Sequence, residues 1–170
     1  MRIRPVLAEV AAATALALAG IAAPSAYAAT PPDATYWTQE FMNQGAGVCL
    51  DDSGGLGLRA ISCNADSMKN GYQTWWFTDT GGSFQFSDVK TGRCLDGSAG
   101  AGVRTYTCSD ASYTNGYQKW VEYTYSSDGN WVAWKNVATG KCLDFSSGAG
   151  LRLYTCNTAS FANGYQKWFY

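Results

Sequence analysis

The sequence predicts an all-β domain made of three similar repeats around a pseudo-threefold axis. Three copies of one set of motifs, at constant internal spacing, support this prediction. Short runs of alternating apolar and polar residues indicate strands, and no sustained helical periodicity follows residue 28. A repeat of this size cannot bury its own apolar face, so the three are expected to close around a shared core.

The first 28 residues have the order of regions expected of a secretory signal. Two arginines precede an apolar stretch from Val10 through Ala23, and Ala26-Tyr27-Ala28 follows it. Small residues at these positions predict cleavage after Ala28. The apolar stretch is about 14 residues long, whereas a membrane span needs roughly 20. We therefore expect export, removal of residues 1–28, and a linker over residues 29–35 before the domain.

The charge of the remaining chain argues against two classes of partner. Removing residues 1–28 takes Arg2, Arg4 and Glu9 from the 12 basic and 13 acidic residues, which leaves 10 and 12. A net charge near −2 gives no electrostatic reason to expect nucleic acid or an anionic membrane as partner. No later apolar run is long enough to span a bilayer. We expect a monomer with neither partner after signal removal.

The cysteines reveal the repeats. Three pairs are each separated by 14 residues: Cys49 and Cys63, Cys94 and Cys108, Cys142 and Cys156. Each first cysteine opens a Cys-Leu-Asp motif, and a Gln-x-Trp motif begins 10 residues after each second cysteine, at 73–75, 118–120 and 166–168. Asn-Gly-Tyr comes directly before each glutamine. The repeats are therefore placed at about 36–80, 81–125 and 126–170.

An even number of cysteines in an exported chain predicts three disulfides. Zinc binding is the alternative, but the sequence has no histidine and no C-x2-C spacing. Pairing within each repeat is the simplest connectivity, because it gives every repeat the same geometry. In the chain-entropy model, each disulfide then adds roughly 3 kcal/mol to the free energy of unfolding.

The strands are expected as hairpins. Residues 77–86 break at Gly81-Gly82, and residues 121–125 turn at Asp128-Gly129 into residues 131–135. Each repeat has room for roughly four short strands, which gives about twelve. The last repeat ends at Tyr170, so the N-terminal segment near Tyr36-Trp37 is expected to pair with it and cover its edge.

Together, the three Cys-Leu-Asp motifs and the three Gln-x-Trp motifs resemble the ricin-type β-trefoil lectins, particularly the short three-repeat actinobacterial members. The resemblance covers about residues 36–170 and implies a β-trefoil with up to three shallow sugar pockets. In that family the aspartate of Cys-Leu-Asp accepts hydrogen bonds from sugar hydroxyls. An aromatic residue two positions before the second cysteine stacks on the sugar, and a polar residue after that cysteine adds contacts.

By this resemblance the candidate carbohydrate-binding residues of the third repeat are Asp144, Tyr154 and Asn157. The second repeat offers Asp96 and Tyr106, with Ser109 in place of asparagine. In the first repeat the matches are Asp51 and Asn64, but Ile61 occupies the aromatic position. The family often has asparagine directly before Gln-x-Trp, where this sequence has tyrosine, so the pocket rim is expected to differ at Tyr117 and Tyr165.

Structural roles compete with the binding roles of these residues. Strand alternation puts Arg152 and Tyr154 on the face opposite Leu151 and Leu153, and hence at the surface. Such tyrosines could instead shield disulfides, and the aspartates could pair with Arg59, Arg104 and Arg152 or bond turn amides. The glutamines and tryptophans of Gln-x-Trp are expected in the core, with the amide bonding buried backbone.

The sequence argues against an enzyme. It has no histidine, its cysteines are assigned to disulfides, and the chain after residue 28 has only two glutamates. A glycosidase needs two unequal carboxylates, whereas these aspartates repeat symmetrically. We expect no cofactor and no metal site. The favoured partner is a polysaccharide or glycan, and the alternative is a protein partner, as for an inhibitor or a subunit of a secreted complex.

Overall fold

The computed structural model describes residues 35–127 and 129–169. The expected signal and most of the linker lie outside them. Six strand segments form a closed barrel. The first segment consists of β1 (Thr35–Glu40) and β2 (Met42–Asn43) together. The other five are β5 (Thr74–Asp79), β6 (Phe84–Asp88), β9 (Trp120–Tyr125), β10 (Trp131–Asn136) and β13 (Trp168–Phe169). The barrel closes because β1 pairs with β5, β2 pairs with β13, and only Phe41 separates β1 from β2.

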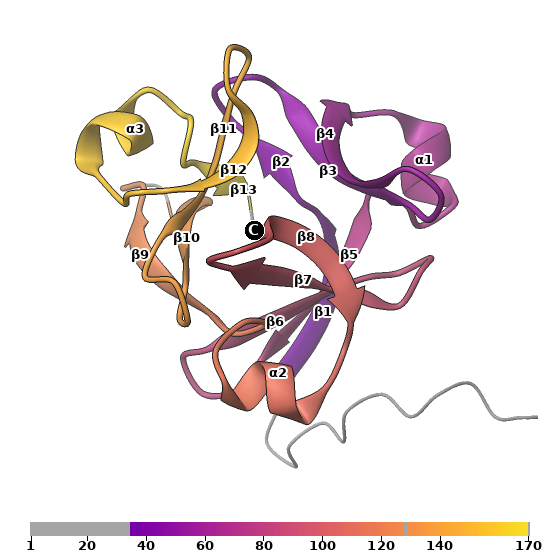
Figure 1. The fold of residues 1–170 in the computed structure, drawn as a ribbon. Coiled ribbons are helices and arrows are strands. Elements are labelled where there is room, and N and C mark those ends of the chain that lie inside the picture. The colour runs from indigo at the N-terminus through magenta and orange to yellow at the C-terminus, as the bar shows by residue number, and fades with distance from the viewer. Residues whose placement is uncertain (1–34, 128, 170) are drawn as a thin grey trace, which may run out of the picture.

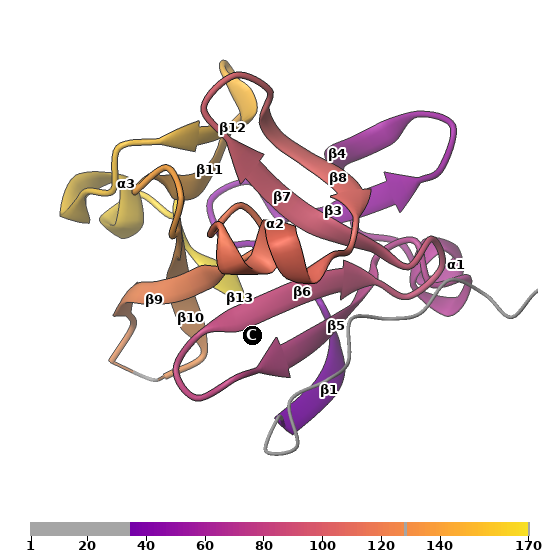
Figure 2. The same ribbon diagram turned by 60° about the horizontal axis from the view of Figure 1, so that its bottom comes forward.

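Three hairpins extend from the barrel, one in each repeat. They are β3 (Val48–Ser53) with β4 (Gly57–Ser62), β7 (Arg93–Ser98) with β8 (Gly102–Thr107), and β11 (Cys142–Ser146) with β12 (Gly150–Tyr154). Figure 1 shows three lobes around the centre, and Figure 2 shows the hairpins gathered at one end of the barrel. This arrangement is the predicted β-trefoil, with the predicted hairpins at Gly81-Gly82 and between β9 and β10.

The core repeats with the same symmetry. Each Gln-x-Trp tryptophan is fully buried, and its indole N–H donates to the carbonyl of the leucine in the Cys-Leu-Asp of its own repeat, at 3.1, 3.0 and 2.9 Å. A second layer consists of Phe41, Phe86 and Trp134, whose ring centroids lie 4.9 to 6.5 Å apart. Large buried aromatic rings at equivalent positions explain how repeats with few aliphatic residues fill a common core.

The N-terminal strand differs from the sequence prediction. Tyr36 and Trp37 lie in β1 and pair with Thr78 and Phe77 of β5, not with the end of the chain. The segment that pairs with β13 is Met42–Asn43, through Asn43 and Trp168. The expected edge is covered, but by residues further along the chain. The Trp37 ring stacks on Phe77 at 5.6 Å, which places β1 over the first repeat.

Each repeat also contains a five-residue helix that apolar periodicity did not reveal. The helices are α1 (Ala65–Lys69), α2 (Asp110–Thr114) and α3 (Thr158–Ala162). None buries a side chain, so no apolar stripe marks them. Each ends at the asparagine of Asn-Gly, and the following glycine has a φ of +83 to +86°, as expected for a helix C-terminus.

The disulfide prediction is confirmed. Cys49–Cys63, Cys94–Cys108 and Cys142–Cys156 are each bonded, with a Cα–Cα distance of 5.0 Å in all three. Each links the first strand of a hairpin to the segment after its second strand, so it fixes the site-bearing hairpin to the helix that follows. Within the described residues, no helix is long and apolar enough to cross a membrane.

Buried polar side chains occupy three equivalent positions, Asn43, Asp88 and Asn136, and the two asparagines join neighbouring repeats. The amide nitrogens of the two asparagines each donate toward three backbone carbonyls around an Asn-Gly-Tyr-Gln segment. A carboxylate has no N–H to donate. Asp88 instead accepts bonds on one oxygen from Lys90 N, Thr91 N and the Thr91 hydroxyl, and its buried second oxygen has no hydrogen-bond partner in the described chain.

Candidate functional site

An aspartate and an arginine face each other across every hairpin. The strand register pairs Asp51 with Arg59, Asp96 with Arg104 and Asp144 with Arg152. Each arginine Nε donates to one carboxylate oxygen, at 3.0, 3.1 and 2.8 Å respectively. The pairing that the sequence allowed as a structural role is therefore present in all three repeats.

In the second and third repeats the arginine also covers a tyrosine. The guanidinium carbon of Arg104 lies 4.6 Å from the centre of the Tyr106 ring, and that of Arg152 lies 4.4 Å from Tyr154. Both rings stay accessible, with 51% and 44% of the tyrosine surface exposed. A buried acid, a guanidinium held by it and an exposed aromatic ring thus lie side by side.

The aspartates themselves are almost inaccessible. Asp51 and Asp144 are 0% exposed and Asp96 is 2% exposed. Their arginines remain partly exposed, and the terminal amino groups of Arg104 and Arg152 make no hydrogen bond to any described residue. The groups that this surface offers to a ligand are therefore guanidinium N–H donors and tyrosine rings. In this conformation the aspartates themselves are not accessible to a ligand.

The polar residue after each second cysteine caps a helix. Asn64 accepts a hydrogen bond from Ser67 N at 2.8 Å, and Asn157 accepts one from Ser160 N at 2.7 Å. Ser109 caps α2 in the same way. The amide nitrogens of the two asparagines also donate to the carbonyls of Ser62 and Thr155. Their side chains thus fix the segment after the hairpin, and the strong preference of asparagine and serine for N-caps is the sequence signal for this role.

The glutamines of Gln-x-Trp support the same segment from inside, as predicted. All three are fully buried. Each side-chain oxygen accepts from the backbone N–H of the capping residue, at 2.9 to 3.1 Å, and each amide donates to a carbonyl two residues before that cap. In the third repeat Gln166 donates to the second carboxylate oxygen of Asp144 as well, at 3.2 Å. Asp144 is thereby held on both oxygens.

The tyrosine before each of these glutamines lies beside the end of the aspartate-bearing strand. The carbonyl of Tyr165 accepts from Phe145 N at 2.9 Å, one residue after Asp144, and the carbonyl of Tyr117 accepts from Gly97 N at 2.8 Å. Both tyrosines are exposed, at 39% and 41%. The structure therefore brings all the candidate residues of one repeat to the same hairpin and the helix that follows it.

The first repeat lacks the aromatic part of this arrangement. Ile61 stands opposite Cys49, where the other repeats have Tyr106 and Tyr154 opposite Cys94 and Cys142. No ring of residues 35–127 and 129–169 lies beneath Arg59, and its NH2 group donates to Ser53 Oγ at 2.9 Å. The second oxygen of Asp51 is buried without a partner in the described chain. The three hairpins are thus alike in backbone and unequal in chemistry.

The comparison with protein families decides the assignment. A model of the ricin-type β-trefoil lectin domain matches residues 37–168. The chain belongs to this family. As a ricin-type β-trefoil domain it is a carbohydrate-binding domain, and it has one disulfide in each of its three repeats.

Solved structures agree on the fold of this ricin-type domain. ThreeFoil, a designed threefold-symmetric protein, is 17% identical with a TM-score of 0.59, over 78% of this chain and 96% of that one. SeviL, solved bound to asialo-GM1 saccharide, is 18% identical with a TM-score of 0.59, over 79% and 96%. A GlcNAcα1-4Gal-releasing endo-β-galactosidase from Clostridium perfringens is 13% identical with a TM-score of 0.63, over 77% and 31%. No curated protein sequence matches the chain.

Proposed function

We propose that the protein is a secreted, monomeric, non-catalytic lectin that binds a polysaccharide or glycan through its second and third repeats. The observation that carries this proposal is the pairing of an exposed tyrosine ring with an adjacent guanidinium in those two repeats. A sugar ring has an apolar face that packs on an aromatic ring and hydroxyls that accept from charged donors. The arrangement offers both at one place.

Each residue then has a distinct part in binding. The sugar ring stacks on Tyr106 or Tyr154, while the free amino groups of Arg104 and Arg152 donate to its oxygens. The buried aspartates hold these arginines in place, and accept from sugar hydroxyls where the arginine moves aside. The caps Asn157 and Asn64 position the segment that follows the second cysteine. Tyr117 and Tyr165 form the pocket rim.

Two sites on one rigid domain suit a repetitive ligand. A shallow site that touches one or two sugar rings binds weakly, with a Kd near 1 mM. A polysaccharide that reaches both sites gains from the effective concentration of the second site, and its apparent affinity rises accordingly. The first repeat, which has Ile61 in place of tyrosine, contributes little.

Several features support secretion and the absence of catalysis. The signal-like N-terminus and the three disulfides suit an oxidising compartment outside the cell. The sequence contains no histidine that could act as a base, and the three aspartates of the hairpins are occupied by arginines. Their buried, salt-bridged state suits a scaffold for binding.

The double variant Tyr106→Ala/Tyr154→Ala is expected to abolish retention on the polysaccharide that the wild type binds. Both rings are exposed, so their loss removes the stacking surfaces with little change in core packing, and the melting temperature should move little. Each single variant keeps one site and should lose the gain from two-site binding. Affinity electrophoresis or retention on immobilised polysaccharide measures the effect.

A matched control removes two exposed tyrosines elsewhere. Tyr123 and Tyr125 lie on β9, are 43% and 68% exposed, and Tyr123 also has a cation, Lys135, over its ring at 5.8 Å. The variant Tyr123→Ala/Tyr125→Ala should bind as the wild type does. Full retention by Tyr106→Ala/Tyr154→Ala would sink the assignment of the site. Retention that free monosaccharide cannot compete away would favour a protein partner instead.

A further inference from the structure

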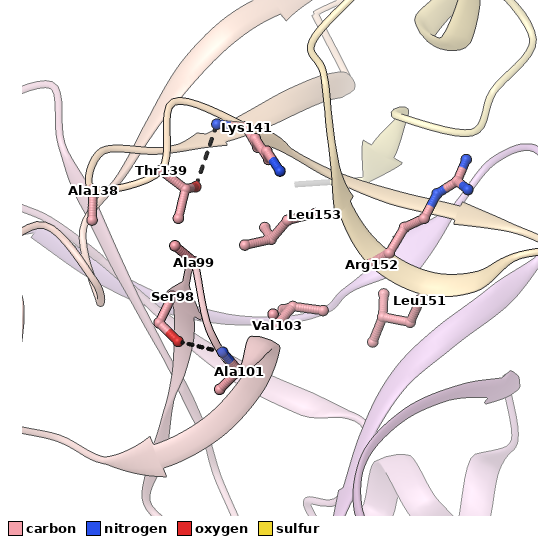
Figure 3. Close-up of a pocket in the computed structure, with 11 residues that line it drawn as sticks. Ser98, Ala99, Ala101, Val103, Ala138, Thr139, Lys141, Leu151, Arg152 and Leu153 are labelled. Carbon is pink, nitrogen blue, oxygen red and sulfur yellow. Dashed lines mark hydrogen bonds between the residues drawn. The ribbon is translucent and has the colours of Figure 1, made fainter.

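A cavity of about 500 Å³ lies between the second and third repeats, apart from the tyrosines of the proposed sugar sites. Its walls come from the β7–β8 hairpin, from β12 and from the loop before β11, and most of its apolar lining is aliphatic: Ala99, Ala101, Val103, Ala138, Leu151 and Leu153. Figure 3 shows these side chains around the cavity together with Thr139 and Lys141, while the guanidinium of Arg152 points away from it. This volume falls in the range of small-molecule sites.

The equivalent place between the first and second repeats is occupied by a network of the chain's own side chains. Its centre is Asp52, which is 0% exposed. Arg93 donates to both carboxylate oxygens of Asp52, from Nε at 2.9 Å and from NH2. The hydroxyls of Thr91 and Thr105 donate to the same carboxylate, the latter at 2.8 Å. A buried carboxylate with four donors fills this boundary.

The repeat spacing shows what replaces this network at the second boundary. The residues 45 positions after Asp52 and 48 positions after Arg93 and Thr105 are Gly97, Lys141 and Leu153. Thr139 corresponds to Thr91. The cation and the hydroxyl are thus kept, whereas the carboxylate is replaced by glycine. Lys141 and Thr139 line the cavity, and Lys141 has no ion-pair partner among residues 35–127 and 129–169.

At the third boundary, between the third and first repeats, the three equivalent positions are all apolar. The position of Asp52 is taken there by Phe145, which packs against the core, and the positions of Arg93 and Thr105 are taken by Val48 and Ala60. This boundary therefore lacks both the carboxylate and the cation of the first boundary. In the described chain, the second boundary thus combines a retained cation, a missing carboxylate and an open cavity.

We propose that this cavity binds a small organic acid, whose carboxylate lies beside Thr139 and Lys141, the equivalents of the Thr91 and Arg93 that donate to Asp52 at the first boundary. The ligand carboxylate accepts from the Lys141 ammonium, while the Ser98 hydroxyl, across the cavity from Lys141 in Figure 3, accepts from Ala101 N. The body of the ligand is compact and aliphatic, because Val103, Leu151 and Leu153 line the cavity and no aromatic ring does. The cavity shares Arg152 with the proposed sugar site of the third repeat, but the guanidinium points away from it and neither Tyr106 nor Tyr154 lines it.

The test uses 4-methylpentanoate as the probe, followed by the methyl NMR signals of Val103, Leu151 and Leu153 in the oxidised protein. Saturable shifts with a Kd of about 1 to 10 mM are expected. The uncharged analogue 4-methylpentanamide should bind at least about fivefold more weakly, since one partly exposed charged contact is lost. Glucuronate, which carries the same charge on a hydroxylated body, should also bind more weakly.

Two variants locate the site. Lys141→Met keeps the aliphatic stem and removes the charge, and it should weaken 4-methylpentanoate binding about fivefold without affecting 4-methylpentanamide. Lys69→Met, at an exposed position in α1, is the matched control and should bind normally. Ala99→Phe fills the cavity from an exposed turn and should abolish the shifts while the protein stays folded.

The results with the amide and with the two variants decide whether the acid binds in this cavity. Equal binding of the acid and the amide, or normal binding by Lys141→Met, would overturn the carboxylate assignment. Binding that survives Ala99→Phe would show that the acid sits elsewhere. The Tyr106→Ala/Tyr154→Ala variant should still bind 4-methylpentanoate, so failure of the sugar sites and failure of this site are distinguished in the same set of proteins.

Discussion

Replacing Asp52 with alanine is expected to lower the free energy of unfolding by about 3 kcal/mol, because it leaves buried donors without their acceptor. Thr105 is 8% exposed, and its hydroxyl bonds Asp52 at 2.8 Å. Arg93 would lose both of its contacts to this carboxylate. Urea unfolding, followed by tryptophan fluorescence with the disulfides intact, measures the loss.

A double-mutant cycle separates the ion pair from simple truncation. Arg93→Ala alone leaves the Asp52 carboxylate buried and without its cation, so it should also be costly. The double variant Asp52→Ala/Arg93→Ala should lose less than the sum of the two, with a coupling energy above about 1 kcal/mol. Asp110→Ala, at an exposed site, should change stability by no more than about 0.5 kcal/mol. Additive losses in the cycle would mean that the network is not a coupled unit.

The sequence was sufficient for the fold because its information is repeated. Cys-Leu-Asp and Gln-x-Trp are linked by one hydrogen bond from each tryptophan to each leucine carbonyl, so the same local solution occurs three times. The spacing of the cysteines then specified the disulfides. What the motifs could not show is which N-terminal residues close the barrel, since β2 is only two residues long and carries no strand pattern of its own.

The sequence indicated which residues to consider for the candidate site, but it did not predict how they are arranged. Strand alternation placed Arg152 and Tyr154 on the outer face, but the ion pair of Arg152 with Asp144 depends on the register between β11 and β12. The helix caps were missed because a five-residue helix with no buried side chain leaves no apolar period. The sequence signal for these helices was the capping residue itself, an asparagine or serine before a short polar segment.

The residues at the boundaries between repeats differ among the three copies, although the motifs themselves are the same. Asp52, Gly97 and Phe145 occupy one equivalent position, so comparison of the three copies marks it as a place where the hairpins differ. Such breaks in an otherwise repeated pattern locate individual features of the molecule. The same comparison identifies Asp88 as the single carboxylate at a position where the other two repeats have asparagine.

Asp88→Asn is expected to stabilise the protein at neutral pH by up to about 3 kcal/mol. Burial raises the pKa of Asp88 to about 6, the charge of Asp52 adds to the rise, and hydrogen bonds from Thr91 and Lys90 oppose it. By equivalence with Asn43 and Asn136, its second oxygen faces the carbonyls of an Asn-Gly-Tyr-Gln segment. An asparagine amide donates to such carbonyls, as a protonated Asp88 would, but a carboxylate repels them.

The direction of the pH dependence follows from the raised pKa. Between the unfolded value of 3.8 and the folded value of about 6, the native protein holds a proton that the unfolded chain has lost. The contribution of Asp88 is therefore fully present below pH 4 and is lost as the pH rises through 6. Asp88→Asn should flatten this part of the stability curve, measured by urea unfolding from pH 4 to 8, and its advantage should grow with pH.

The control for this substitution is Asp110→Asn, which makes the same chemical change at an exposed position and should leave the pH dependence of the wild type intact. Asp52, whose charge acts on Asp88, and its partner Arg93 are unchanged in both variants. A loss of stability in Asp88→Asn at pH 7 would contradict the equivalence with Asn43 and Asn136. It would mean that the carboxylate is needed for the bonds from Lys90 and Thr91, and that the first boundary differs from the other two in backbone as well as in side chains.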